Sequence, residues 1–361
     1  MSFPERHAEA AYDGGLPVSP RPIVIVGAGG IVRDAHLPAY RKAGFAVWGI
    51  VDRVVERAQE LATEYAIAHV FGSTEDAVAA APADAVYDVA LPPEHYARTL
   101  EALPDGAPVL VQKPLGHSLD EARRLREICR RKRLIAAVNT QLRFAPYIAV
   151  ARELIADGAI GELYDMEIRV QVKTPWEQFP HVFGLDRLEI TMHSIHYIDL
   201  VRSFLGDPQS VSAVTVRHPS KPDLATTRTT IVMRYPGRPL RVTVHTNHDH
   251  VFGEEFEQSY VKWEGTDGAV MAQMGLLLDY PRGGRDLLRR HRGEGGWEDV
   301  PFSGSWFPDA FIGSMSALQR FVEGSISVLP TAIDDVIRTM AVVEAAYRSD
   351  AVEGVPLDAI D

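Results

Sequence analysis

The helix predicted for residues 188–206 carries side chains suited to acid–base chemistry. Glu189, His193 and His196 fall at positions i, i+4 and i+7, which places them on one helical face. Buried polar groups in this pattern need partners, so the face is either an internal hydrogen-bond cluster or the wall of a pocket. An imidazole, with an ordinary pKa of about 6.5, is suited to removing a hydroxyl proton at neutral pH.

A metal-binding interpretation of this helix lacks a third ligand. Glu189 and His193 are spaced to reach one ion, but the sequence offers no clear further ligand for them. His245, His248 and His250 form a second cluster, in which strand alternation puts His245 on the opposite face from the other two. We therefore predict a polar pocket or an internal histidine cluster here, and no metal.

A lysine follows another predicted strand. Residues 108–111 are apolar and lead into Gln112, Lys113 and Pro114. The carboxyl ends of parallel strands form the ligand-binding edge of a sheet, and a proline stiffens the turn there. Two interpretations are equally supported by this pattern: an exposed loop lysine, and a lysine held beside the reactive ring of a cofactor.

The first strand and helix of the chain predict a nucleotide-binding turn. An apolar strand at residues 23–26 leads into Gly27, Gly29 and Gly30, and a helix follows over residues 31–43. Glycines let the backbone approach a ligand, and the free amides of a helix N-terminus favour a pyrophosphate. The whole series of strand, glycines and helix is more specific than the glycines alone.

An acidic residue ends the second strand, which is predicted for residues 46–51. Asp52 lies 25 residues after Gly27, close to the spacing at which a carboxylate accepts hydrogen bonds from an adenosine ribose. Its charge repels a 2′-phosphate, so NAD is the predicted cofactor. Arg53 beside it keeps NADP open as the alternative, because a guanidinium binds phosphate.

Strand-like and helical segments alternate up to about residue 145. The predicted strands are 23–26, 47–51, 85–90, 108–111 and 134–138, and the predicted helices are 31–43, 53–65, 94–102 and 118–132. This order predicts an α/β domain with a doubly wound parallel sheet over residues 21–145. Ser118 and Glu121 form a capping-box pattern at the start of the last helix. Residues 1–20 read as a flexible lead-in.

Beyond residue 145 the pattern changes to long alternating strands. These are 163–174, 210–217, 227–235, 240–246 and 259–264, with helices at 147–157, 188–206, 308–324 and 332–348. Alternation with turn signals predicts an α+β domain over residues 146–361, with an open and mostly antiparallel sheet.

The composition excludes several classes of partner. The chain has 361 residues, of which 46% are hydrophobic and 24% charged, and its formal net charge is -12. Nucleic acid requires a basic surface, and no apolar run approaches the ~20 residues that span a bilayer. The single cysteine, Cys129, excludes an internal disulfide framework. We therefore expect a cytoplasmic protein that binds neither nucleic acid nor membrane.

Together these motifs resemble the glucose-fructose oxidoreductase / inositol 2-dehydrogenase / rhizopine catabolism (Gfo/Idh/MocA) family. The matching residues are Gly27-Ala28-Gly29-Gly30-Ile31 with His36 and Pro38, Pro92-Pro93 with His95, Lys113-Pro114-Leu115, Arg143-Phe144-Ala145-Pro146, Ile160-Gly161 and His196-Tyr197-Ile198-Asp199. The resemblance covers almost everything after residue 21. It implies an N-terminal Rossmann domain and a C-terminal α/β domain whose open sheet forms a homodimer or homotetramer.

The resemblance also implies roles for individual residues. Lys113 and His196 would act on a sugar or polyol hydroxyl beside the nicotinamide. The cofactor would contact Gly27, Gly29, Gly30, Ile31, Asp52, Arg53, Leu91, Pro92, His95, Gln112 and Lys113. The substrate would contact Asn139, Arg143, Trp176, Glu189, Met192 and His193. For Trp176, packing on its own domain is as well supported as stacking on a sugar ring.

Two departures from the family pattern affect the expected chemistry. Gln112 stands where the family has the glutamate of Glu-Lys-Pro, and Met192 stands where many members carry an aspartate four residues before the catalytic histidine. The predicted function is NAD(P)-dependent oxidation of a secondary hydroxyl, or the reverse reduction. The alternatives are a glycosidase that oxidises its substrate transiently with NAD, and a non-catalytic nucleotide-binding regulator.

Overall fold

The computed structural model describes residues 15–280 and 282–352. The chain divides into two compact units, which consist of Met1–Ala149 with Phe302–Met340, and of Val150–Pro301 with Ala341–Asp361. Most of the expected lead-in, residues 1–14, lies outside the described residues. None of the helices in the described ranges has the length and apolar character that a membrane crossing requires.

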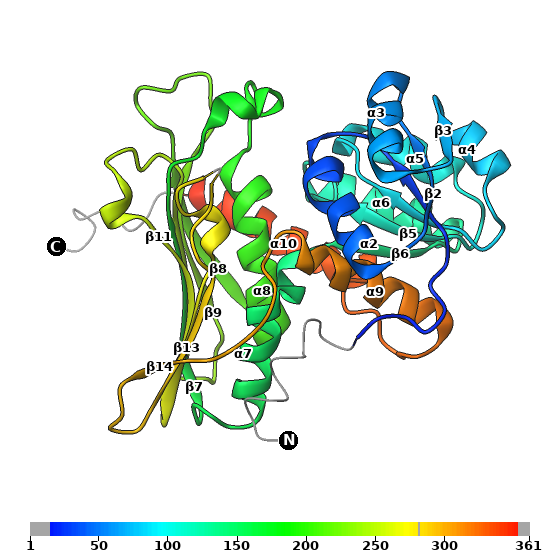
Figure 1. The fold of residues 1–361 in the computed structure, drawn as a ribbon. Helices are drawn as coiled ribbons and strands as arrows, with labels where there is room; N and C mark the ends of the chain where they lie inside the picture. The colour runs from blue at the N-terminus through cyan, green and yellow to red at the C-terminus, as the bar shows by residue number, and fades with distance from the viewer. Residues whose placement is uncertain (1–14, 281, 353–361) are drawn as a thin grey trace. The chain divides into compact units, whose positions relative to one another are not determined.

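The first unit contains a six-stranded parallel sheet in the order β3-β2-β1-β4-β5-β6 (Figure 1). Its strands are β1 (Ile23–Val26), β2 (Val47–Val51), β3 (His69–Phe71), β4 (Val86–Val89), β5 (Pro108–Gln112) and β6 (Ile135–Asn139). Every residue of β1 and of β4 is buried, because both faces of a parallel sheet are covered by its crossover helices. The predicted doubly wound parallel sheet is confirmed.

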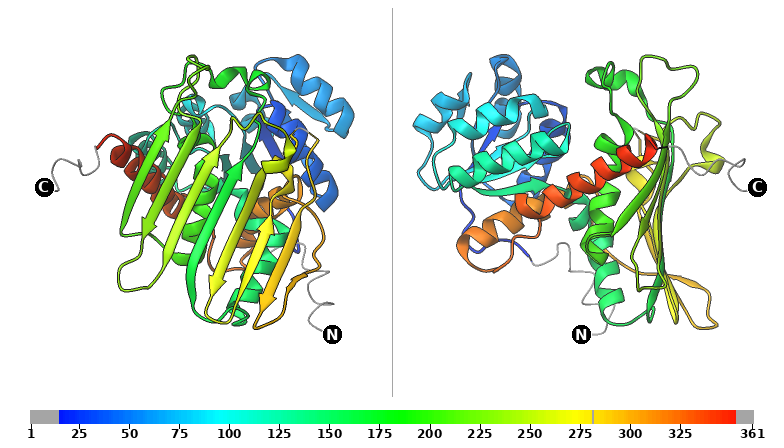
Figure 2. Two further views of the ribbon diagram at one scale, coloured as in Figure 1. Left: turned by 90° about the vertical axis from the view of Figure 1, so that its left-hand side faces the viewer. Right: turned by 180° about the vertical axis from the view of Figure 1, so that it is seen from behind.

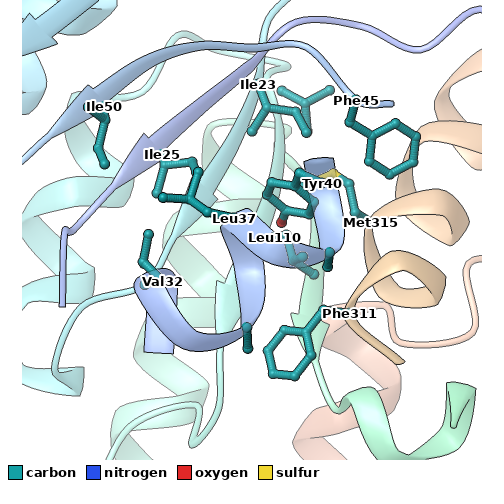
Figure 3. Close-up of a cluster of buried hydrophobic side chains, with 14 of the residues drawn as sticks. Ile23, Ile25, Val32, Leu37, Tyr40, Phe45, Ile50, Leu110, Phe311 and Met315 are labelled. Atoms are coloured by element: carbon teal, nitrogen blue, oxygen red, sulfur yellow. The ribbon is translucent and has the colours of Figure 1, made fainter. Parts of the chain in front are cut away.

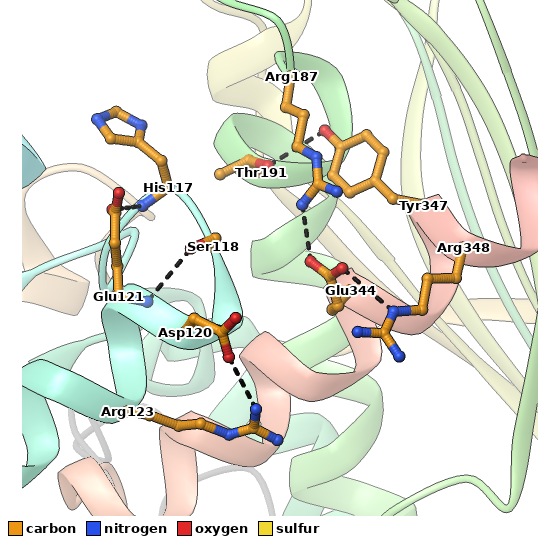
Figure 4. Close-up of polar contacts among 10 residues, drawn as sticks. All are labelled: His117, Ser118, Asp120, Glu121, Arg123, Arg187, Thr191, Glu344, Tyr347 and Arg348. Carbon is orange, nitrogen blue, oxygen red and sulfur yellow. Dashed lines mark hydrogen bonds and ion pairs between the residues drawn. The ribbon is translucent and has the colours of Figure 1, made fainter.

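Most helical segments of this unit begin near the predicted positions, but α4 and η3 had not been predicted. They are η1 (Val32–His36), α2 (Leu37–Ala43), α3 (Val55–Tyr65), α4 (Thr74–Ala80), η2 (Pro93–His95), α5 (Tyr96–Ala102), α6 (Leu119–Arg131), η3 (Gln141–Phe144) and α9 (Asp309–Glu323). The predicted cap of α6 is confirmed, since the Ser118 hydroxyl accepts from the Glu121 N–H at 3.2 Å (Figure 4). The Glu121 carboxylate in turn accepts from the His117 N–H at 2.7 Å.

Helix α9 belongs to the first unit, although it comes late in the chain. Its residues Phe311 and Met315 lie in the same buried cluster as Tyr40, Leu37 and Ile25 (Figure 3). From the order of elements in the sequence, this helix was expected in the C-terminal domain over residues 146–361. Its periodicity indicates an apolar face but does not show which sheet that face covers, and the structure packs it on the parallel one.

The second unit contains an eight-stranded sheet in the order β14-β13-β12-β11-β7-β10-β9-β8. Its strands are β7 (Leu163–Gln171), β8 (Ser210–Val216), β9 (Arg228–Arg234), β10 (Arg241–Asn247), β11 (Gln258–Gly265), β12 (Gly268–Gln273), β13 (Leu287–Arg292) and β14 (Trp297–Asp299). All neighbours are antiparallel except β7 and β10. The predicted mostly antiparallel sheet is confirmed, although the last three strands had not been predicted.

One face of this sheet is covered by helices and the other is open (Figure 2). Met166, Ile168 and Val170 of β7 are buried, whereas Glu167 and Arg169 between them are partly exposed. This alternation with period two is the pattern of a sheet that packs on one side only.

The remaining segments of the second unit lie around this sheet. They are η4 (Trp176–Gln178), η5 (Pro180–Val182), η6 (Ile190–Ser194), α8 (Ile195–Leu205), η7 (Glu254–Phe256) and η8 (Gly275–Leu277). Two further helices, α7 (Pro146–Ala156) and α10 (Ile333–Asp350), begin in the first unit and end in the second. The single helix predicted for residues 188–206 therefore opens with a π-helical segment, η6.

Candidate functional site

The glycine turn after β1 is shaped by backbone contacts that only glycine permits. Gly27 has φ +114°, and a Cβ there would lie 2.4 Å from the Ala90 carbonyl oxygen. Gly29 is exposed, and a Cβ there would meet nothing within 4 Å. The N–H groups of Gly29 and Gly30 have no acceptor among the residues that the structure describes. Open space and free amides at a helix N-terminus fit a pyrophosphate.

Asp52 fixes the glycine turn to the end of β2. Its carboxylate accepts one hydrogen bond from the Ala28 N–H and one from the Val54 N–H, both at 2.8 Å. The side chain is half-buried, and each oxygen retains a further lone pair. Asp52 can therefore hold the turn and still accept from a ribose hydroxyl.

The other expected cofactor contacts lie at the same edge of the sheet. Arg53 follows Asp52 and is exposed, Leu91 and Pro92 follow β4, and His95 is exposed at the end of η2. The carboxyl ends of parallel strands meet at one edge. The first unit thus gathers the predicted contacts where its fold class binds ligands.

Lys113 directly follows β5, and the residue as a whole is partly exposed. Burial of its ammonium group lowers the pKa of Lys113 to about 8. Its backbone N–H donates to the Gln112 side-chain oxygen at 2.8 Å, and the Gln112 carbonyl accepts from the Tyr96 hydroxyl at 2.6 Å. These two hydrogen bonds fix the backbone that leads into Lys113.

A fully buried polar cluster contacts the side chain of Gln112, the residue before Lys113. The sequence pattern does not predict it. The Asp88 carboxylate contacts His36 Nδ1 at 2.6 Å and accepts from the Tyr40 hydroxyl at 2.7 Å. None of these three side chains is more than 1% exposed. Burial and the neighbouring carboxylate raise the pKa of Tyr40 well above its usual value, so its hydroxyl is a donor. An aspartate inside the apolar strand β4 was the available sequence signal.

Asn139 and Arg143, which were expected to contact substrate, are engaged inside the first unit. The Asn139 side chain is fully buried, with its amide nitrogen 3.5 Å from His36 Nε2. The Arg143 guanidinium donates to the Pro330 carbonyl at 2.8 Å and to the Asp335 carboxylate at 2.7 Å. These contacts hold both side chains within the first unit, and their roles as substrate contacts stay predictions.

In the second unit the π-helical segment changes which residues meet. Glu189, His193 and His248 bring their side-chain oxygen and nitrogen atoms within 4.8 Å of one another. Glu189 is fully buried and His248 is 2% exposed. His196 lies on the first turn of α8 and is 8% exposed. The expected third partner of Glu189 and His193 on the helix face, His196, is thus not in this group; His248 takes that place from the end of β10.

Trp176 and Met192 belong to an apolar cluster of the second unit. Trp176 is 2% exposed and packs with Val182 and Leu188, and Met192 packs against the same cluster. The Trp176 indole N–H donates to the Asp249 carboxylate at 3.1 Å. Of the two interpretations of Trp176, packing on its own domain is the one that the structure shows, because a side chain so enclosed offers no face to a sugar.

The segment η6 is fixed in the second unit by contacts with α10 (Figure 4). The Arg187 guanidinium donates to the Glu344 carboxylate at 2.7 Å and lies over the Tyr347 ring, 4.5 Å from its centroid. The hydroxyls of Thr191 and Tyr347 are 3.1 Å apart. These contacts hold the turn that carries His193 in place.

Comparison with known families now identifies the fold. Residues 21–140 match the sequence profile of the Gfo/Idh/MocA oxidoreductase family, which is described by its NAD-binding Rossmann fold. Residues 148–271 match the profile of the C-terminal domain of the same family. The chain belongs to the Gfo/Idh/MocA family. It is an NAD(P)-dependent oxidoreductase, as the sequence analysis predicted.

Individual Gfo/Idh/MocA relatives match over most of the chain. A 1,5-anhydro-D-fructose reductase from Ensifer adhaerens is 26% identical, over 91% of this chain and 97% of the relative. A D-apiose dehydrogenase from Paraburkholderia graminis is 24% identical, over 90% and 86%. The crystal structure of an oxidoreductase from Agrobacterium radiobacter in complex with NAD+, L-tartaric acid and magnesium superposes with a TM-score of 0.78 at 20% identity, over 92% and 97%.

The buried cluster accounts for one departure from the Gfo/Idh/MocA pattern. The Gln112 amide nitrogen is 3.2 Å from His36 Nε2, while its oxygen accepts from the Lys113 N–H. A carboxamide can donate to one partner and accept from the other, which places the His36 lone pair on Nε2 and its proton on Nδ1, facing Asp88. A glutamate at 112 would only accept, and it would add a second carboxylate to a site that already contains Asp88.

Proposed function

We propose that this oxidoreductase oxidises a secondary hydroxyl of a sugar, polyol or sugar derivative, and that Lys113 and His196 carry out the proton chemistry. The observation that carries the proposal is Lys113, a lysine with a pKa near 8 at the ligand-binding edge of a Rossmann sheet. Two relatives named for anhydrofructose and apiose support a carbohydrate substrate.

Each proposed residue has one task in the reaction. The Lys113 ammonium group donates a hydrogen bond to the substrate hydroxyl oxygen and stabilises the negative charge that develops there. His196 accepts the hydroxyl proton as general base. A bound nicotinamide dinucleotide supplies the hydride acceptor. Met192 contributes apolar surface near the histidine and no proton transfer.

The glycine turn and its neighbours are proposed to hold the dinucleotide. The amides of Gly29, Gly30 and Ile31 bind the pyrophosphate, and Asp52 accepts from the ribose hydroxyls. Leu91, Pro92, His95 and Gln112 complete the site along the same sheet edge.

Asp52 is proposed to select NAD over NADP. We expect kcat/KM with NAD to exceed that with NADP by more than about 10-fold, because the carboxylate repels a 2′-phosphate. Asp52→Asn removes the charge while it keeps an acceptor for the turn, and we expect it to narrow the ratio. Steady-state kinetics with both cofactors measure this, and thermal unfolding shows whether the variant stays folded. A wild-type preference for NADP would contradict the assignment of Asp52, and Arg53→Ala would then test the guanidinium.

The proposed substrate class is tested with a panel of inositols, aldoses, uronates and glycosides screened for NADH fluorescence. Bound cofactor is identified by mass spectrometry in the same preparation. Net NADH formation with a sugar or polyol is the expected result. Glycoside cleavage without net NADH would favour the transient-oxidation glycosidase, and tight NAD binding without turnover of any compound would favour a regulator.

We also propose that the chain acts in the cytoplasm as a homodimer or homotetramer through the open face of the second sheet. Its acidic charge and single cysteine support the compartment. The partly exposed face of β7 and its neighbours supports the interface, since an uncovered sheet face of this size is a surface for association.

A further inference from the structure

The buried cluster of Glu189, His193 and His248 in the second unit contains a carboxylate that no lysine or arginine pairs within the described ranges. Both carboxylate oxygens of Glu189 accept from the Ser194 hydroxyl, at 2.9 Å each. Its ion-pair contact within the described ranges is with His248, whose Nε2 lies 3.4 Å from the Glu189 oxygen. That separation is longer than a normal N–H···O hydrogen bond. Burying a carboxylate is costly, and a nearby cation offsets that cost.

The orientation of His248 is fixed from its other side. Its Nδ1 is 3.1 Å from the Thr174 hydroxyl oxygen. When Nδ1 donates to Thr174, the lone pair of Nε2 faces the Glu189 carboxylate, so that two acceptors point at each other. A cation between them removes this conflict. Metal-binding histidines commonly have their second nitrogen held by such a partner.

Two cations can occupy this position, a proton on His248 or a divalent metal ion. A proton needs only one imidazole, yet the structure places a second one against the first. The His193 and His248 rings stack with centroids 4.2 Å apart and an interplanar angle of 28°. Two neutral imidazoles and a carboxylate are the donor set of many divalent transition-metal sites. The third ligand that the sequence did not reveal is His248.

The surroundings of the cluster permit binding. Trp176 meets both rings edge-on, at centroid distances of 5.6 Å from His193 and 6.0 Å from His248, and forms an apolar wall. His193 is only partly buried, and its ligand atom already lies within 4.8 Å of those of Glu189 and His248. Three protein ligands leave at least one position for water or a substrate hydroxyl.

We propose that Glu189, His193 and His248 bind one divalent transition-metal ion. The ion links η6 to the end of β10 and neutralises the buried carboxylate. All three ligands lie in the second unit, and the proposed proton transfer is assigned to none of them. Metal binding can therefore be measured separately from sugar oxidation.

The test uses the full chain, freed of any affinity tag and of metal by a chelator, and titrated with Co2+. We expect one Co2+ per chain by elemental analysis, with a visible absorption band that Zn2+ displaces. Glu189→Gln and His248→Asn should each weaken Co2+ binding by more than about 10-fold. His245→Asn is the matched control, because His245 lies on the open face of β10 beside Thr230, and it should bind as wild type does.

Several outcomes would overturn the proposal. One is a wild-type chain that retains no stoichiometric Co2+ after dialysis. Another is Co2+ binding that survives in both ligand variants, since the metal would then be elsewhere. Thermal unfolding of each variant shows whether weaker Co2+ binding comes from a lost ligand or from a lost fold. If His248→Asn does not fold, the isosteric Glu189→Gln alone tests the site. The wild-type chain could also fail to bind Co2+ while Glu189→Gln raises its thermal midpoint. The cation beside Glu189 would then be a proton and not a metal ion.

Discussion

Lys113→Ala is expected to lower kcat for the oxidation by roughly 10²–10⁴-fold, because it removes the group that stabilises the developing negative charge. His196→Asn should lower kcat by a similar factor, since asparagine cannot accept the hydroxyl proton. Both variants should still bind NAD, which fluorescence titration of the dinucleotide checks. Turnover within a few-fold of wild type in either variant would remove that residue from the mechanism.

The lowered pKa of Lys113 predicts a definite pH dependence. The ammonium form is the one that donates to the substrate oxygen, so kcat/KM should fall as the pH rises through about 8, where Lys113 of the free enzyme loses its proton. Lys113→Arg keeps its charge throughout this range and should show no such fall near pH 8. A kcat/KM that increases through pH 8 in wild type would instead make the neutral amine the base.

Asp88→Ala is expected to destabilise the first unit by about 3 kcal/mol or more. The substitution leaves the His36 N–H and the Tyr40 hydroxyl without their acceptor at a position that solvent does not reach. A loss of this size lowers the thermal midpoint by roughly 6–12 °C for a unit of this length. Differential scanning calorimetry measures the change.

Two further substitutions test whether the lost stability of Asp88→Ala comes from the buried carboxylate. Asp88→Asn keeps one acceptor oxygen and should cost less than alanine. Asp84→Ala alters an exposed acid just before the same strand and should shift the midpoint by little more than experimental error. If Asp88→Ala and Asp84→Ala were equally mild, the buried cluster would not hold the backbone beneath Lys113.

The sequence predicted those elements whose local pattern is strong. The apolar runs behind β1 and β5 and the capping residues of α6 each specify their own element, and the structure has them within a residue or two. Strand β3 has only three residues and α4 only seven, too few for a periodic signal to stand out. Helix α9 was predicted as a helix, but its place in the first unit depends on long-range packing that periodicity does not encode.

In the candidate site, too, residues with a local sequence signal were predicted and contacts between distant positions were not. Gly27, Asp52 and Lys113 were found because each has a local signal, a glycine, an acid or a lysine directly after an apolar strand. The approach of His248 to Glu189 joins positions 59 residues apart, and only the fold brings them together. The pairing of Gln112 with His36 is equally non-local, and for that reason the sequence shows Gln112 only as a departure from the family pattern.

The π-helical segment η6 has a consequence for engineering this protein. An α-helix advances about 100° per residue, so deleting one residue between Glu189 and His193 would let the segment close as a regular helix and would rotate Glu189 by about that angle relative to α8. Glu189 would then leave His248, while His196 would keep its position on α8. Deleting one residue here would therefore separate the proposed metal binding from the proposed proton transfer without changing any ligand or base.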